Sequence, residues 1–448
     1  MQSQEGNRGC GGGHHQKRAA GHQGEMSYLR HCDVQDFRWK SRHYAGTGAC
    51  ETSVAELRIM AEQLAYVIIT PYSLHKSRTG GILSRLLSRT GLELAGARMF
   101  APSEELVKKY CEATISANDP QDRRIQELIY NYLLQNLSPD PKTGRRRRVM
   151  MLLFQGEDAV RKTRSVIGNI SPERRGGETI RDTYGDLIID EDDQVRYFEP
   201  AVLAAPTPEE AESKLKLWAQ YSDQDGGVVE NTIAYPAGER PQRTLVLIKP
   251  ENFRFPTGRP GNMIDFFSRT GLFIVAVKVH RMSVAQAMEF YGPVREVLRT
   301  KLKDVVASKA KTALEKELGL KIPAEQEKEL GNVLGPIFGD NQFENIVRFM
   351  SGRTPSESPE SELNKPGSEK CIALVYEGVE AVRKIRDILG PTDPSKAPPG
   401  SIRREFGQTV MVNAAHASDS VENAAREIRI INVAENNFKK VIEEFYGK

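Results

Sequence analysis

The 448-residue sequence contains the same succession of local patterns twice. Residues 66–71 form a short β-branched run that ends in proline, and residues 80–91 have the pattern of a helix closed by glycine. Residues 245–250 and 261–271 repeat that order later in the chain. One hydrophobic core rarely organises a chain of this length, so the repeat predicts two paralogous domains.

A second pair of matching blocks, residues 159–168 and 381–390, lies further apart in the sequence than the first pair. The second copy therefore holds extra residues, and they fall at about 295–340. In that stretch Leu, Val and Ala recur at helical spacing among many Lys and Glu residues, which predicts an added helical hairpin. Because acidic and basic residues are interspersed, the pattern favours a solvated amphipathic helix over a nucleic-acid surface.

Both copies have the same predicted order of elements: strand, helix, strand, helices, strand, helix, strand and a final helix. Short β-branched runs at residues 273–279 and 371–376 supply two of the strands in the second copy. Such an order packs naturally as a split β-α-β, or ferredoxin-like, arrangement. We therefore predict an α+β fold with two domains, residues 60–235 and 236–448, each containing a four-stranded antiparallel sheet.

The first 59 residues differ from the rest of the chain. They are glycine-rich and have little apolar periodicity, which favours a disordered leader. The leader also contains a set of metal-ligand types whose spacing matches no standard zinc pattern, namely Cys10, His14, His15, His22 and Cys32. Since Met60 closely precedes the first strand, the leader is alternatively an upstream extension, and N-terminal mass spectrometry that finds Met1 would refute that hypothesis.

The charge balance excludes some classes of partner. With 63 basic and 60 acidic residues the formal net charge is +3, so no strong field for nucleic acid or anionic membrane is expected, and the basic run 145–148 is interpreted as a loop edge. No apolar run approaches the length of a membrane helix, and the N-terminus lacks the apolar centre of a signal peptide. A cytoplasmic location also fits the odd number of cysteines: Cys10, Cys32, Cys50, Cys111 and Cys371.

The strongest signal for chemistry is the run Asn-Ala-Ala-His-Ala-Ser-Asp at residues 413–419. A neutral imidazole is a good nucleophile toward phosphorus near pH 7 if one ring nitrogen is free and an acceptor holds the other. Glu427 can be that acceptor, because it lies about two turns into a following helix. We expect Asp419 or Ser420 to begin that helix, with Glu422 completing a capping box. Its buried face is predicted to carry Ala424, Ala425, Ile428 and Ile431.

This run contains the complete signature Asn-x-x-His-(Gly or Ala)-Ser-Asp, and residues 243–432, apart from the insertion, resemble nucleoside diphosphate kinases. A lone histidine would favour a structural role, but the full signature reverses that preference. The resemblance implies that His416 is transiently phosphorylated and passes the terminal phosphate of a nucleoside triphosphate to a nucleoside diphosphate in a ping-pong reaction. It also implies Mg²⁺ bound through the nucleotide without a protein ligand cluster, and a homo-oligomer.

The resemblance assigns further residues to the site. Lys249 matches a lysine near the ribose and the transferred phosphate, and Tyr291 matches a tyrosine that shapes the histidine pocket. Asn413 corresponds to an asparagine that hydrogen-bonds the sugar. Taken singly, each of these residues has an ordinary structural explanation, and only their order around the histidine argues for function. The remaining assignments are two arginines that clamp the phosphates, a hydroxyl beside them and two serines that support the histidine and its glutamate: Arg386, Arg403, Thr392, Ser418 and Ser420.

The sequence departs from the family pattern where the base binds. Gln342 stands at the position that usually stacks a phenylalanine on the base, and Phe343 follows one position later. We assign Phe343 and Ile346 to nucleotide binding on the same resemblance. Because the family binds the base loosely, we expect broad nucleotide use with weakened affinity and retained phosphotransfer.

The first copy lacks the residues that the reaction needs. Thr70 stands at the lysine position, and the segment 198–208, which should carry the nucleophile, contains no histidine. No histidine occurs between His75 and His280. We therefore interpret the first copy as a degenerate kinase domain. Arg164 and Arg181 persist at positions that match the phosphate clamp, and we favour inherited surface charge over nucleotide binding for them.

Two other classes of function remain open on the sequence. One is a non-catalytic nucleotide-binding or scaffold protein of the same fold, which the degenerate first copy and Gln342 would suit. The other is a protein-histidine phosphotransfer module, in which His416 would carry phosphate without delivering it rapidly to diphosphates. The complete set of site residues in the second copy favours the kinase.

Overall fold

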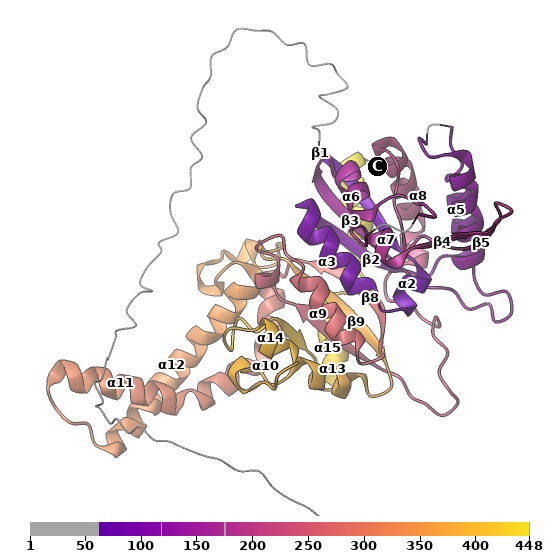
Figure 1. Ribbon diagram of the computed structural model, residues 1–448. Helices are drawn as coiled ribbons and strands as arrows, with labels where there is room; N and C mark the ends of the chain where they lie inside the picture. The colour runs from indigo at the N-terminus through magenta and orange to yellow at the C-terminus, as the bar shows by residue number, and fades with distance from the viewer. Residues whose placement is uncertain (1–61, 118, 174–175, 448) are drawn as a thin grey trace, which may run out of the picture. The chain divides into compact units, whose positions relative to one another are not determined.

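The computed structural model describes residues 62–117, 119–173 and 176–447, so the predictions for residues 1–59 lie outside it. The protein is of the α+β class and contains two four-stranded antiparallel sheets, which confirms that part of the predicted fold (Figure 1). A small two-stranded sheet pairs β4 (Asp186–Ile189) with β5 (Val195–Glu199). Below, residues 62–235 are called the first half and residues 236–447 the second half.

The two large sheets have the same strand order. The first is arranged β2-β3-β1-β6 and the second β8-β9-β7-β10, with every neighbouring pair antiparallel. The strands of the first half are β1 (Glu62–Ile69), β2 (Glu93–Phe100), β3 (Val149–Glu157) and β6 (Val202–Leu203). Those of the second half are β7 (Gln242–Ile248), β8 (Phe273–His280), β9 (Cys371–Gly378) and β10 (Ala415–Ala417).

Helices pack around both sheets (Figure 1). The first half contains α2 (Pro71–His75), α3 (Thr79–Thr90), α4 (Glu104–Glu112), α5 (Arg123–Asn136), α6 (Ala159–Ile167), α7 (Ile180–Tyr184) and α8 (Pro208–Asp225). The second half contains α9 (Arg259–Ser268), α10 (Val284–Lys301), α11 (Lys303–Leu318), α12 (Ala324–Ser351), α13 (Ala381–Leu389), α14 (Ile402–Phe406), α15 (Val421–Ile431) and α16 (Asn437–Tyr446). Four short 3-10 helices complete it: η1 (Pro250–Asn252), η2 (Pro355–Glu357), η3 (Glu360–Glu362) and η4 (Pro394–Lys396).

The repeat extends to irregular details of the backbone. A bulge interrupts β2 between Leu94 and Gly96, and a bulge in β8 lies at the corresponding place. The residues before α6 and α13, Asp158 and Glu380, both adopt the left-handed conformation, with φ of 55° and 57°. Such residues are uncommon outside glycine, so their recurrence supports a common origin of the two halves.

The sheets are buried on both faces. In β1 and β7 the residues are buried almost from end to end, although successive side chains point to opposite faces of a sheet. Both faces of each sheet must therefore be covered by other elements. This explains why the central strands are continuous apolar runs in the sequence and not alternating ones.

The two halves meet where α3 and α9 cross. Gly80 and Gly261 allow this approach, because a Cβ atom on Gly261 would lie 2.2 Å from the carbonyl oxygen of Gly80, and one on Gly80 would lie 2.3 Å from the carbonyl oxygen of Gly261. Beside the glycines, the hydroxyl of Ser84 donates a hydrogen bond of 2.8 Å to the carbonyl of Gly258. The same elements of both halves thus form a contact in which any larger residue would collide with backbone.

The C-terminal helix α16 follows the second sheet in sequence but packs against the first half, beside α8 (Figure 1). Phe438 is 1% exposed, and its ring centroid lies 5.3 Å from that of Phe100 in an edge-on contact. Phe100 also contacts Trp218, at 4.9 Å. At the far end of α16 the hydroxyl of Tyr446 donates to the carbonyl of Leu64 at 3.2 Å. The last helix therefore completes the core of the first half.

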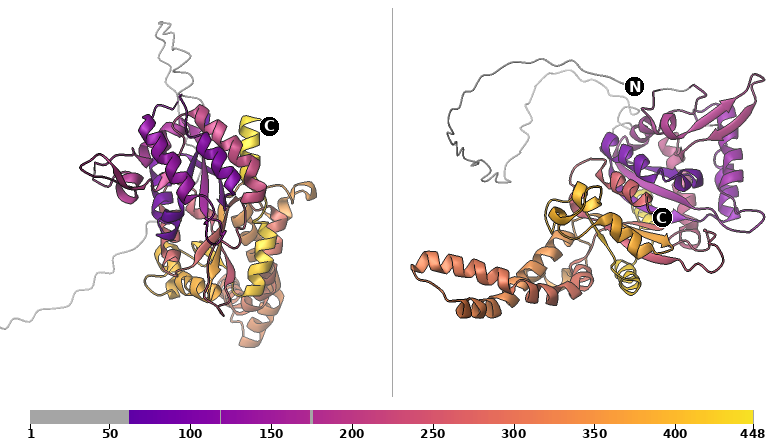
Figure 2. Two further views of the ribbon diagram at one scale, coloured as in Figure 1. Left: turned by 90° about the vertical axis from the view of Figure 1, so that its right-hand side faces the viewer. Right: turned by 60° about the horizontal axis from the view of Figure 1, so that its bottom comes forward.

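Residues 295–340, for which the sequence predicts a helical hairpin, lie in the end of α10, in α11 and in the first part of α12. Figure 2 shows α11 and α12 side by side. Asp340 ties α12 to α10, because its carboxylate accepts hydrogen bonds from Arg295 at 2.8 Å and Arg299 at 2.7 Å. This shared carboxylate fixes the two helices where the hairpin leaves the rest of the half.

None of the helices in the described part of the chain has the length and apolar character that crossing a membrane requires. Cys111 and Cys371 are buried free thiols, and burial raises the pKa of each to about 12, so both remain protonated at neutral pH. The other three cysteines lie outside the described residues.

Candidate active site

His416 lies at the edge of the second sheet. It is the central residue of β10, a three-residue strand, and pairs with Leu247 of β7. The side chain is 22% exposed, so it is neither turned into the interior nor freely solvated. The edge position leaves the imidazole partly exposed while the sheet holds the flanking backbone.

The imidazole contacts the carboxylate that the sequence predicts. Nε2 of His416 lies 2.9 Å from Oε2 of Glu427, whose side chain is 7% exposed. The hydroxyl of Ser418 donates to the same Glu427 oxygen at 2.6 Å. The rings of Phe290 and Tyr291 both contact the imidazole edge-on. Their ring centroids lie 4.9 Å and 6.1 Å from that of His416, respectively. Aromatic rings and a buried carboxylate therefore fix the orientation of the histidine.

The position of Glu427 depends on where α15 begins. Ser420 is the N-cap residue, and its hydroxyl accepts from the backbone N–H of Asn423 at 3.0 Å. The predicted capping box with Glu422 is therefore wrong, because a Ser420 cap makes Asn423 the third helical residue. It is also Ser418, not Ser420, that bonds Glu427. The inward face of α15 carries Glu427 as expected, together with Ala424, Ile430 and Ile431, whereas Ala425 is exposed and Ile428 only half-buried.

Sequence reasoning missed two residues of this cluster. Phe290, next to the predicted Tyr291, makes the closer aromatic contact with His416. Arg426 donates to the carbonyl of Phe290 at 3.2 Å and lies 3.8 Å from the second oxygen of Glu427. It thereby links α15 to α10 behind the histidine. The Arg residue directly before Glu427 was a usable signal, since a buried carboxylate usually has a cationic neighbour.

Lys249 directly follows β7, at the N-cap position of η1, and is 8% exposed. Its ammonium donates to the carbonyl of Met411 at 2.5 Å and to Oδ1 of Asn413 at 2.9 Å, and it lies 4.9 Å from the ring centroid of Phe349. The pKa of Lys249 is lowered to about 8, and burial is the largest cause. The nearby charge of Arg403 also lowers this pKa, whereas the charge of Glu251 raises it. The ammonium is thus a weakly solvated cation held against the loop that leads to His416.

The two predicted clamp arginines lie close together. Arg403 donates to the carbonyl of Gly390 at 3.0 Å and to that of Ala415, the residue before His416, at 3.1 Å. The pKa of Arg403 is lowered to about 10, mainly because the guanidinium is buried and to a smaller extent because Arg386 carries the same charge nearby. Arg386 is exposed on α13. One arginine is therefore fixed beside the histidine, while the other presents its charge to solvent.

Asn413 joins these elements. It is 4% exposed; besides accepting from Lys249, it donates to the carbonyls of Val410 at 2.8 Å and Thr392 at 3.2 Å. Thr392 itself is exposed. The three residues that the sequence places near the sugar and phosphates, Lys249, Thr392 and Asn413, are thus connected directly.

The residues predicted near the base lie on α12. Phe343 is 4% exposed, and the guanidinium of Arg295 lies 5.5 Å from its ring centroid. Gln342 and Ile346 are partly exposed. No contact described for Phe343 or Ile346 joins them to the cluster around His416.

Polar atoms without partners gather in this region. Among residues 62–117, 119–173 and 176–447, the buried side-chain atoms without a hydrogen bond include Oε2 of Glu251, the hydroxyl of Tyr291 and Nε of Arg403. Burial raises the pKa of Tyr291 well above its usual value, so the hydroxyl stays protonated and can donate. Unsatisfied buried polar atoms are uncommon in folded proteins, and a role in binding or catalysis is one explanation for them.

The described residues contain no group of three or more His, Cys, Asp or Glu side chains that could hold a metal ion. The two carboxylates at the site are already engaged. Glu427 accepts from Ser418 and contacts His416, and Glu251 accepts from the backbone N–H of Ala414 at 2.9 Å.

The strand register identifies the first-half counterpart of the site. Leu203 pairs with Ile68 as His416 pairs with Leu247, so Leu203 occupies the position of the histidine. Thr207 caps α8 as Ser420 caps α15, which places Lys214 at the position of Glu427. Lys214 is 4% exposed and lies 2.9 Å from Glu210. An apolar side chain and a lysine thus replace the histidine and its carboxylate.

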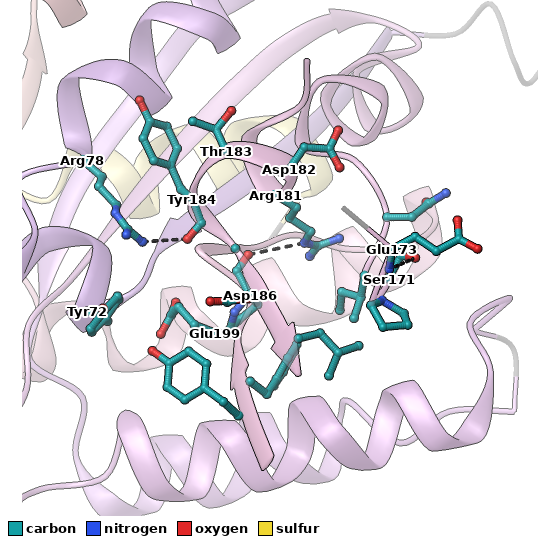
Figure 3. A pocket seen from close by; sticks show the side chains of 18 residues that line it. Tyr72, Arg78, Ser171, Glu173, Arg181, Asp182, Thr183, Tyr184, Asp186 and Glu199 are labelled. Carbon is teal, nitrogen blue, oxygen red and sulfur yellow. Dashed lines mark hydrogen bonds between the residues drawn. The ribbon is translucent and has the colours of Figure 1, made fainter. Parts of the chain in front are cut away.

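A cavity of about 310 Å³ lies on this side of the first half, lined by residues that include Arg78, Arg181 and Glu199 (Figure 3). Arg181 donates to the carbonyls of Gly168 at 2.8 Å and Val202 at 3.2 Å, which are the counterparts of the contacts of Arg403. Interpreting Arg181 as inherited surface charge is therefore wrong, because it ties backbone segments together. Glu199 accepts from Thr70 at 2.9 Å and Tyr132 at 2.7 Å, so its carboxylate stands beside the residue that replaces Lys249.

Comparison with known proteins identifies the family. The family model described as nucleoside diphosphate kinase matches residues 63–223 and 361–436, together more than half of the chain. The chain belongs to the nucleoside diphosphate kinase family. The match is split, and the residues between its two segments include the helices α10, α11 and α12.

Individual relatives agree with the family model. The chain is 31% identical over 190 residues to a nucleoside diphosphate kinase of Staphylothermus marinus, covering 42% of this chain and 92% of that protein. It is 30% identical over 187 residues to one of Campylobacter hominis, with shares of 42% and 92%. Among solved structures, the nucleoside diphosphate kinase of Aquifex aeolicus is 28% identical, covers 43% of this chain and 95% of its own, and has a TM-score of 0.27. The NDP kinase of Pyrobaculum aerophilum is also 28% identical, with the same shares and a TM-score of 0.29.

Proposed function

We propose that the protein is a nucleoside diphosphate kinase in which His416 carries the phosphoryl group between a nucleoside triphosphate and a nucleoside diphosphate. The observation that supports this most directly is the contact of Nε2 of His416 with a buried carboxylate that also accepts from Ser418. A carboxylate accepts hydrogen bonds and does not donate them, so Nε2 carries the proton. Nδ1 is then the nitrogen with the free lone pair.

The reaction proceeds in two displacements. Nδ1 attacks the terminal phosphorus, the N–P bond forms, and the bond from that phosphorus to the bridging oxygen breaks, so the nucleoside diphosphate leaves with the electron pair. The phosphorylated ring still carries its Nε2 proton and is therefore positively charged. The Glu427 carboxylate, 2.9 Å away, stabilises that charge. A second nucleoside diphosphate then attacks the phosphorus and returns the lone pair to Nδ1.

The cations of the site stabilise the charge that spreads over the oxygens of the phosphoryl group in flight. Lys249 is anchored to the backbone carbonyl of Met411 and Arg403 to that of Ala415, and Arg386 adds exposed charge next to Arg403. Because these donors are held before substrate binds, little reorganisation is needed in the transition state. Mg²⁺ on the nucleotide phosphates supplies further neutralisation when it is bound.

Nucleotide binding is proposed for Asn413 and Thr392 on the sugar and phosphate side. For Phe343 the burial favours a packing role, because Arg295 covers its ring and leaves little of it to stack on a base. Ile346 remains a candidate base contact. Weak base recognition agrees with broad use of nucleotides.

We also propose that residues 60–235 and 236–448 are two domains of ferredoxin-like topology, of which only the second is catalytic. Leu203 has no nucleophilic atom, and Lys214 cannot accept the hydrogen bond that orients an imidazole. The Glu199 carboxylate beside Thr70 would repel a phosphate where the second half has an ammonium. The first half is then a structural partner of the second.

The labelled phosphate is expected to pass through the protein in a fixed stoichiometry. Purified protein incubated with ATP labelled at the terminal phosphate should take up one acid-labile phosphate per chain, which mass spectrometry places on His416. Addition of GDP should then move the label to GTP. A protein that stays unlabelled is a scaffold or binding protein. One that keeps its label in the presence of GDP is a phosphotransfer module, and a second phosphate per chain would refute the inactive first half.

The rate is expected to depend on the charge of Lys249. Because the pKa of Lys249 is about 8, its ammonium is lost as the pH rises through that value. Above pH 8, kcat/KM for the triphosphate should fall about tenfold per pH unit, because this ratio reports groups of the free enzyme. Initial rates at subsaturating ATP between pH 6.5 and 10 measure the profile. A constant kcat/KM from pH 7 to 10 would show that the Lys249 charge does not contribute.

A further inference from the structure

Ala414 lies two residues before His416 in a conformation that L-amino acids rarely adopt. Its φ is 73°, in the left-handed region, where a side chain with a Cβ costs on the order of 1 kcal/mol. The bend it makes separates Asn413 from the strand that carries His416. Some interaction must hold the bend, because the intrinsic preference of alanine opposes it.

The turn after β7 holds both polar groups of Ala414. Oε1 of Glu251 accepts from the N–H of Ala414 at 2.9 Å. The carbonyl of Ala414 accepts from Nδ2 of Asn252 at 2.9 Å and from the N–H of Lys249 at 3.0 Å. The turn formed by residues 249–252 thus holds Ala414 by both its N–H and its carbonyl.

The first half contains the same bend, held by a carboxylate from another place in the chain. Ala201 has φ of 61°, and its N–H donates to Oε1 of Glu199 at 2.9 Å. Its carbonyl accepts from the hydroxyl of Ser73 at 2.9 Å. Glu199 lies two residues before its alanine, whereas Glu251 lies on the opposite turn. Two different solutions to one requirement indicate that a carboxylate on this N–H is needed to keep the bend.

In the second half this carboxylate also adjoins the catalytic groups. Burial raises the pKa of Glu251, and its second oxygen has no hydrogen-bond partner among the residues described. The charged groups near the carboxyl are Lys249 and Arg254. The negative charge of Glu251 raises the pKa of Lys249, whereas the positive charge of Arg403 lowers it. Glu251 therefore acts on two elements of the site, the bend and the lysine.

We propose that Glu251 is a positioning residue for phosphoryl transfer, which holds Ala414 in its bend and so sets Asn413 and His416 in register with Lys249. The inference rests on the proposed kinase function. Glu251 contacts neither the imidazole nor, in this proposal, the nucleotide. Its effect is transmitted through the backbone of residues 413–416 and through the charge of Lys249.

The test compares Glu251→Ala, Glu251→Gln and the control Glu239→Ala, an exposed glutamate of the second half in the turn before β7. Glu251→Ala should lower kcat on the order of 10- to 100-fold with KM changed much less, since a displacement of about 1 Å in a reacting group has effects of that size. Glu251→Gln keeps an acceptor oxygen for Ala414, so most of kcat should return. Glutamine has no negative charge to raise the pKa of Lys249, so that pKa should be lower in Glu251→Gln. The fall of kcat/KM at high pH should therefore begin at a lower pH than in the wild type. Glu239→Ala should behave as the wild type.

A double variant separates positioning from loss of stability. Glycine adopts positive φ without strain, so Glu251→Ala combined with Ala414→Gly should recover part of the lost kcat when both variants are assayed well below their thermal midpoints, where both are fully folded. Wild-type kcat in Glu251→Ala, or no recovery in the double variant, would overturn the inference. Failure of the wild type to take up phosphate would instead overturn the proposed function, so the two failures are distinct.

Discussion

Replacement of His416 by alanine is expected to reduce nucleotide exchange by a factor of roughly 10⁴ or more and to abolish acid-labile phosphorylation of the protein. The reason is chemical, since a ping-pong reaction cannot proceed without the atom that forms the intermediate. The fold should survive, because the imidazole is partly exposed and Glu427 keeps its hydrogen bond from Ser418. Exchange is measured as GTP formed from ATP and GDP, and phosphorylation by label retained at high pH and lost in acid.

Two comparisons make this result decisive. His75→Ala removes an exposed histidine of the first half and should leave exchange and labelling unchanged. His416→Asn keeps a polar side chain at the strand edge, so it covers the case in which the alanine variant folds poorly. Exchange at more than about a hundredth of the wild-type rate in a folded His416 variant would remove this residue from the mechanism.

Replacement of Phe438 by alanine is expected to destabilise the whole protein by about 3–5 kcal/mol, the usual cost of removing a buried phenylalanine. Phe438 is 1% exposed and packs on Phe100 of the first half, although it follows His416 and Glu427 in sequence. The buried side chains of both halves form one contiguous core. We therefore expect a single shift of the urea transition and not the loss of one half alone.

The matched control is Phe255→Ala, because Phe255 is 75% exposed. It should change the free energy of unfolding by less than about 0.5 kcal/mol. Unfolding is followed by circular dichroism, and exchange activity is measured across the same urea range. Activity that persists after the first half has unfolded in the Phe438 variant would contradict the view that the halves fold as one unit.

The two four-stranded antiparallel sheets and the contact between His416 and Glu427 could be predicted from the sequence. The apolar runs that begin at Tyr66 and Leu245 and the recurring helix patterns have strong periodicity, and the signature around His416 is contiguous. Glu427 could be placed because helical spacing relates it to a cap only a few residues away. Such local regularities survive folding, since they depend on neighbours in the chain.

The rest of the site depends on contacts between distant segments, which one sequence does not reveal. Whether Ser418 or Ser420 reaches Glu427 is decided by the residue at which α15 begins, and both serines suit a helix cap. Glu251 has no signal of its own, because its partner is a backbone N–H in another loop. Leu203 could be matched to His416 only through strand register, since the sequence narrows the position of the missing histidine no further than residues 198–208.

The close approach of Gly80 and Gly261 places both members of a paired surface in one polypeptide. The two halves belong to one chain, so their association is intramolecular and dilution does not separate them. The covalent connection between the halves sets the effective concentration at which they meet. After duplication of an ancestral gene, selection would then act unequally on the first copy. Its residues at the positions of His416 and Glu427 are then free to change, whereas Gly80 must be kept for as long as α3 crosses α9.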